Sequence, residues 1–151
     1  VSNSTFGVGT DYSVNGNYNY ITYAWKEIQG FSRFSDFYGN GQADGTFAYC
    51  GFRPAFVVIK NVTSTEPWVI YDTKRNPHNV ADLKLTSNTA DSENGNSQTG
   101  GTSYNNIDIL SNGFKMRTNN GATNQASTKF IFAAFAEHPF VSSSGVPTTA
   151  R

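Results

Sequence analysis

The chain has 151 residues, which is enough for one domain with a substantial core and too few for two. Its 11 basic and 11 acidic side chains cancel, and this zero net charge argues against nucleic acid or an anionic membrane as a partner, because phosphate groups are bound by an excess of positive charge. Aromatic residues make up 15% of the chain, which is too high a content for a disordered protein.

The first 31 residues predict an N-terminal hairpin. A strand is expected over residues 5–10, followed by a turn at Asn15-Gly16, a dipeptide that favours tight hairpin turns. Residues 18–28 then alternate so that both faces are largely apolar, which predicts a second strand covered on both sides. Since the chain begins with valine, we expect it to continue upstream in a longer polypeptide.

Residues 47–72 contain the strongest strand pattern, and they follow a glycine-rich, aromatic loop over residues 30–45. A continuous apolar run at residues 56–59, dominated by β-branched side chains, predicts a strand buried on both faces. Turn residues occupy positions 61–67, and the strand pattern resumes at residues 68–71. This stretch therefore predicts a buried hairpin.

The second half of the chain predicts further short strands. Residues 82–86 suit a short edge strand, and residues 86–106 form a long polar loop of a kind that is unusual in a compact domain. A tight hairpin is expected from residues 107–110 and 114–118, which flank a Ser-Asn-Gly turn. Residues 128–137 favour a buried strand over a helix, because three large apolar residues are contiguous and no helix cap precedes them.

Together these elements predict an all-β protein, an antiparallel β-sandwich of jelly-roll or lectin-like type. The main sandwich is expected over residues 32–140, after the hairpin at residues 1–31 and before a C-terminal tail at residues 141–151. No apolar run of about 18 residues is present, so no membrane insertion is expected.

The N-terminal segment of the chain resembles the C-terminal one. Residues 6–10 parallel residues 114–118, and residues 20–31 parallel residues 130–140 with one residue missing. Two interpretations are open. The two hairpins pair within one sandwich, or residues 1–31 close a preceding related unit, since their separation of roughly a hundred residues matches a small sandwich domain.

The sequence predicts no catalytic residue. Glu27 and Glu137 occupy equivalent positions in the repeated pattern, and a glycoside hydrolase needs two carboxyl groups facing each other across a cleft. Capping, or ion pairing to Arg33 or Lys129, is the simpler role for them, and hydrolysis is the weakest alternative. The single cysteine, Cys50, is expected to be a buried small hydrophobe rather than a reactive thiol.

No metal site and no cofactor are predicted either. Both histidines, His78 and His138, lie beside prolines in loops, without a second ligand at a spacing that suits zinc. Three positions offer oxygen ligands but lack the spacing of a calcium-binding loop, so turns are the preferred interpretation. They are Asp44 with Asn40, Asp108 with Asn105 and Asn106, and the run Asp11-x-Ser13-x-Asn15.

Ligand-binding candidates come from loops that combine aromatic and polar side chains, because a sugar ring has an apolar face and a polar rim. They are Tyr38, Asn40, Asp44, Trp68, Arg75 and Tyr104. Two alternatives stay open. The aromatic rings fill the core or a subunit interface, and Arg75 bridges to Asp72 or Asp82 and so holds its own loop.

Four segments in fixed order resemble a concanavalin-like β-sandwich module found near the C-termini of tailed-bacteriophage structural proteins. They read YGNGQADGTFAYCGFRPAFVVIKN (38–61), WVIYDTKRNPHNV (68–80), IDILSNGFKMRT (107–118) and FIFAAFAEHPFVSSSGVPTTAR (130–151).

This resemblance implies a non-enzymatic structural protein on the surface of the virion, either a capsid decoration or a tail-fibre appendage. Its partners would be other virion proteins and copies of itself, with a homotrimer expected. The alternative is a carbohydrate-binding module that recognises a host surface glycan.

Overall fold

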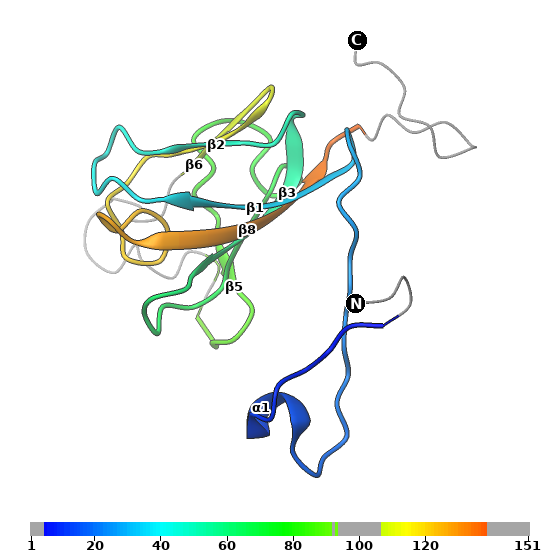
Figure 1. Cartoon of the computed structure of the whole chain (residues 1–151). Coiled ribbons are helices and arrows are strands. Elements are labelled where there is room, and N and C mark those ends of the chain that lie inside the picture. Colours follow the sequence, from blue (N-terminus) through cyan, green and yellow to red (C-terminus); the bar gives the residue numbers. More distant parts are fainter. Residues whose placement is uncertain (1–4, 92, 94–106, 139–151) are drawn as a thin grey trace.

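The computed structural model describes residues 5–91, 93 and 107–138 (Figure 1). Within these residues the chain forms one helical turn and eight strands. They are α1 (Tyr12–Asn15), β1 (Ser32–Tyr38), β2 (Phe47–Tyr49), β3 (Pro54–Asn61), β4 (Val69–Asp72), β5 (Leu85–Thr86), β6 (Ile107–Leu110), β7 (Gly113–Met116) and β8 (Lys129–Ala136). Tyr104, Asn105, Asn106, most of the long 86–106 loop and the tail at residues 141–151 lie outside the described residues. No described helix is long and apolar enough to span a membrane.

The strands form two antiparallel sheets that pack face to face. The larger sheet has the order β1-β8-β3-β4-β5, and the smaller sheet has the order β2-β7-β6. The predicted all-β antiparallel sandwich is confirmed. So are the hairpins β3–β4 and β6–β7, the short edge strand β5 and the strand conformation of β8.

The core lies between the two sheets and is dominated by aromatic rings. Phe37 of β1 stacks on Phe130 of β8 with a centroid separation of 5.1 Å, and Phe114 of β7 meets Phe132 edge-on at 5.1 Å. Each phenylalanine withdrawn from water contributes about 1.5–3 kcal/mol. Cys50 is also buried here, as its apolar context predicts.

The opposite side of the larger sheet carries a central apolar row, with charged residues such as Asp36, Lys60 and Asp72 beside it. Directly paired residues share a face of a sheet, so the register places Phe34, Ala133, Val58, Ile70 and Leu85 in one row across all five strands. We call this surface the outer apolar face. Its large members are Phe34, Phe56, Val58, Ile70, Leu85, Ile131 and Phe135.

The prediction that the 56–59 run is buried on both sides is wrong for a single chain. Val57 and Ile59 point into the core and are fully buried, whereas Phe56 is 36% exposed and Val58 is half-buried. The physical reason is that the second layer of the sandwich covers only one face of β3. The residue pattern is nevertheless that of a strand with an apolar neighbour on each side.

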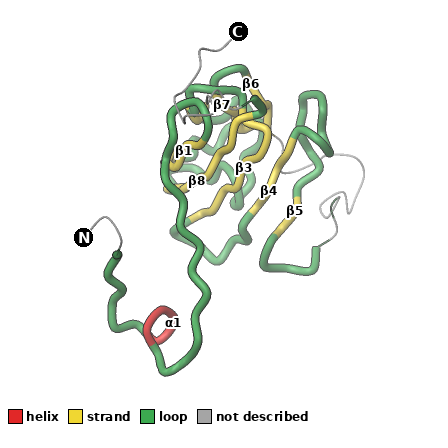
Figure 2. The backbone as a smooth tube through the Cα atoms, turned by 90° about the vertical axis from the view of Figure 1, so that its right-hand side faces the viewer, coloured by secondary structure: helices red, strands yellow, loops and turns green. Residues whose placement is uncertain are grey.

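Residues 5–31 form an arm that runs away from both sheets (Figures 1 and 2). The predicted hairpin with strands at 5–10 and 18–28 is wrong, since none of these described residues belongs to a strand. The expected Asn15-Gly16 turn is instead the C-terminal end of α1, which Asp11 caps by accepting a hydrogen bond from the Ser13 amide at 2.8 Å.

Tyrosine hydroxyls hold the tip of the arm together. The Tyr20 hydroxyl accepts from the Gly16 amide and donates to the Tyr12 carbonyl, both at 2.7 Å. These local bonds replace the ladder that a hairpin would have supplied, and a strand without a neighbour has no such ladder.

Candidate functional site

Three of the candidate residues lie at the end of β1 and in the loop that joins it to β2. Tyr38 ends β1, and Asn40 and Asp44 follow it. The Asn40 side chain donates to the Asp44 carbonyl at 3.0 Å and accepts from the Gln42 amide at 3.0 Å, so this loop is closed on itself. Tyr38 stays outside this network and is 60% exposed.

A buried asparagine from another loop holds this site in place. Asn124 is fully buried, and its side-chain Nδ2 donates to Asn40 Oδ1 at 2.9 Å, to the Gln42 carbonyl at 2.9 Å and to the Thr118 carbonyl at 2.8 Å. Its Oδ1 accepts from the Asn40 amide at 3.1 Å. Sequence reasoning missed Asn124, because in the sequence it is one of several polar residues in a turn.

Cations from the smaller sheet neutralise the exposed carboxylate of this loop. Asp44 forms ion pairs with Lys115 at 2.6 Å and with Arg117 at 3.7 Å. The hydrogen bond and charge of Lys115 lower the pKa of Asp44, so the carboxylate stays ionised. A cation at Asn40 and Asp44 would have to displace these side chains.

Trp68 lies at the same end of the larger sheet but apart from Tyr38. Strands β8 and β3 separate β4 from β1, and three intervals of about 4.8 Å give a separation of roughly 14 Å. The backbone amide of Trp68 donates to Asn88 Oδ1 at 3.0 Å, and its ring is 39% exposed. The two aromatic candidates therefore do not form one platform.

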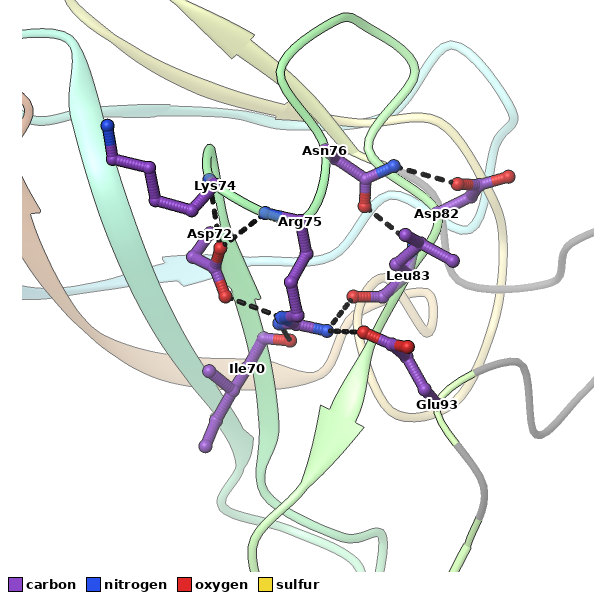
Figure 3. Close-up of polar contacts among 8 residues, drawn as sticks. All are labelled: Ile70, Asp72, Lys74, Arg75, Asn76, Asp82, Leu83 and Glu93. Carbon is purple, nitrogen blue, oxygen red and sulfur yellow. Dashed lines mark hydrogen bonds and ion pairs between the residues drawn. The ribbon is translucent and has the colours of Figure 1, made fainter.

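Arg75 lies at the opposite end of the sheet, in the loop after β4, and its guanidinium contacts its own loop (Figure 3). It pairs with Asp72 at 2.6 Å and with Glu93 at 3.0 Å, and it donates to the Leu83 carbonyl at 2.6 Å. The Asp72 bridge is the one expected from the sequence, whereas Asp82 accepts from Asn76. This arrangement is that of a loop support.

Two ion pairs involve the acidic residues considered for hydrolysis. Glu27 pairs with Arg33 at 2.7 Å, as expected, and Glu137 pairs with Arg53 at 2.8 Å rather than with Lys129. Each carboxylate therefore has a cation of its own, and these pairs attach the ends of β1 and β8 to neighbouring segments.

Asp108 and Cys50 also have structural surroundings rather than those of a reactive site. Asp108 pairs with Arg117 at 3.2 Å, and burial raises the pKa of the Cys50 thiol to about 12. Both histidines, His78 and His138, are exposed. In the part of the chain that the structure describes, no three His, Cys, Asp or Glu side chains gather as a metal site would require.

Residues 1–139 match the model of a family described as a domain of unknown function, DUF7483, and because this match spans most of the chain, the chain belongs to that family. Both the arm and the sandwich fall within the matched residues. No curated protein and no solved structure matches the chain.

Proposed function

We propose that this member of the DUF7483 family is a non-enzymatic structural protein of a bacteriophage particle, a capsid decoration or a tail appendage on the particle surface. It acts by assembly with other virion proteins and with copies of itself, as a homotrimer. The resemblance of four ordered segments to phage sandwich modules supports the location, and the surface of the larger sheet supports the mode of action.

The observation that carries this proposal is the outer apolar face. Phe56, Leu85 and Ile131 are 36%, 38% and 38% exposed. Leu85 ends the row that crosses all five strands, and Phe56 and Ile131 lie on the two sides of this row. Single exposed apolar side chains are ordinary, but a contiguous apolar patch marks an interaction surface. Covering it with a neighbouring subunit would complete the burial that the pattern of β3 predicts.

The contacts of the polar side chains also favour a structural role over an enzymatic one. The acidic and basic side chains described above are paired with each other, and the buried amide of Asn124 is saturated by contacts within the fold. Catalytic groups are instead commonly found with strongly shifted pKa values in a cleft.

Light scattering on the purified chain tests assembly directly. We expect a trimer, and we expect the double variant Phe56→Glu/Ile131→Lys to be monomeric with a retained β-sheet circular dichroism spectrum. Val62→Glu is the control, because Val62 is 46% exposed and lies in the β3–β4 turn, outside the face. A monomeric wild-type chain, or its absence from purified particles by mass spectrometry, would refute the proposal.

Carbohydrate binding is a second candidate, and the exposed ring of Tyr38, at the end of β1 just before the polar loop of Asn40 and Asp44, favours it. A glycan array on the particle protein tests it. Tyr38→Ala should then lose binding, while Tyr49→Ala, which removes a ring that is 59% exposed on β2, should retain it. Equal binding by both variants would exclude this site.

A further inference from the structure

The arm carries a second set of exposed apolar side chains. Ile21, Tyr23 and Trp25 are 83%, 74% and 65% exposed. The rings of Tyr23 and Trp25 stack with centroids 6.1 Å apart, so side chains two residues apart lie on the same side, as in extended backbone. Ile21 continues this spacing, and the three side chains form an apolar edge of about 13 Å at about 3.3 Å per residue.

The dimensions and charges of this edge suit the outer apolar face. The face spans five strands, which is roughly 19 Å at about 4.8 Å per interval, so the edge of the arm fits within it. Residues 12–25 contain no charged side chain, and neither does the row from Phe34 to Leu85. Packing the arm along this row therefore places no charge at its centre, where a buried charge would oppose the association. The charged residues of the same face, Asp36, Lys60 and Asp72, pair with Ile131 and Phe56 on the two sides of the row.

The root of the arm fixes its direction away from its own sandwich. Ile28 and Ser32 exchange backbone hydrogen bonds of 3.3 and 2.8 Å, and the Ser32 hydroxyl donates to the Lys26 carbonyl at 2.9 Å. Glu27 adds the ion pair to Arg33 and accepts from the Phe34 amide at 3.3 Å. For the arm to fold back on its own sheet these bonds would have to break, and Figures 1 and 2 show that it extends into solvent.

We propose that the arm of one copy packs on the outer apolar face of a second copy, with Ile21, Tyr23 and Trp25 as its anchors. Each chain then supplies one arm and one face, and this head-to-tail contact closes into a ring when three copies each give an arm to the next. The inference rests on the proposed function for self-assembly, and it names the two surfaces that meet.

Disulfide trapping between separate copies tests the contact. One chain carries Tyr23→Cys, a second chain of different tagged length carries Ile131→Cys, and both carry Cys50→Ala so that no other thiol is present. After mixing and mild oxidation we expect a covalent heterodimer. A second chain with Val62→Cys, a position off the face that is at least as exposed as Ile131, should give little covalent heterodimer.

Equal trapping at positions 131 and 62, or trapping at neither, would overturn the inference. Trapping that occurs only when both cysteines are in one chain would show that the arm packs on its own sheet, and would overturn it as well.

A variant in the arm provides a measurement that does not disturb the sandwich. The triple variant Ile21→Ser/Tyr23→Ser/Trp25→Ser should weaken association roughly a hundredfold or more, as expected for loss of an aromatic interface centre. The control Phe6→Ser/Val8→Ser, in the same arm, should associate like wild type. If the triple variant still forms the wild-type trimer, the arm is not the contact, whereas the proposed function still stands.

Discussion

Replacing Asn124 by alanine offers the sharpest test of how the β1–β2 loop is held. The side chain is fully buried, donates to three acceptors and accepts from the Asn40 amide. A buried hydrogen bond contributes about 1 kcal/mol net, and the partners left behind in Asn124→Ala lose both the bond and access to water. The amide has two N–H groups, which the three acceptors share, so two donated bonds and one accepted bond predict a loss of about 3 kcal/mol in the free energy of unfolding.

Urea denaturation followed by circular dichroism measures this loss. For a chain of this size about 1 kcal/mol corresponds to roughly 2–4 °C, so the melting temperature of Asn124→Ala should fall by about 10 °C. Asn119→Ala is the matched control, because Asn119 lies in the same loop and is exposed. Its effect should stay within about 0.5 kcal/mol.

A loss below about 1 kcal/mol in Asn124→Ala, with the urea dependence unchanged, would refute the reasoning. It would mean that water replaces the amide, so that the loop is held by its own bonds, such as the one from Asn40 to the Asp44 carbonyl.

Three further predictions follow from single residues. Gly45→Ala should destabilise the fold by about 2 kcal/mol, because a Cβ there would lie 2.6 Å from the Met116 Cβ and carbonyl oxygen. Gly9→Ala, in the open arm, should leave the melting temperature almost unchanged, and equal melting temperatures of the two variants would contradict this prediction. The Cys50 thiol, with its pKa raised to about 12 by burial, should react with a disulfide reagent at pH 8 only after unfolding, and fast reaction of the native chain would show that it is accessible. Burial raises the pKa of Asp72, but hydrogen bonds from Arg75 and Lys74 outweigh burial and hold this pKa below the ordinary value of 3.8. The ionised carboxylate therefore contributes fully to the stability of the fold above pH 3.8, and this contribution is lost as the pH falls through the lowered pKa of the folded state. Asp72→Asn should therefore be less stable than wild type at pH 7 by about 1–2 kcal/mol, with a difference that narrows below about pH 4; a difference independent of pH would exclude this charge effect.

The sandwich was predictable from the sequence because its strands carry their own signals. The β6–β7 hairpin is marked by its Ser-Asn-Gly turn, and β8 by contiguous phenylalanine and isoleucine side chains. The candidate site was less predictable. Asn40 and Asp44 are close in the chain and meet in one loop, directly after Tyr38, whereas the position of Asn124 depends on a contact between residues 84 apart. Nothing local distinguishes this asparagine from Asn119, which is exposed in the same loop.

Two errors of the sequence analysis have a common physical cause. The pattern of residues 56–59 predicts apolar cover on both faces, and that of residues 18–28 predicts a strand with apolar neighbours, yet a single chain supplies neither. Periodicity reports what a segment is suited to contact, and it does not distinguish a contact within the chain from one between chains. The half-buried row on the larger sheet has no apolar layer over it, and the exposed edge of the arm has no apolar surface to pack on. One association between copies would satisfy both patterns, which is why the trapping of position 23 against position 131 also tests the interpretation of the sequence.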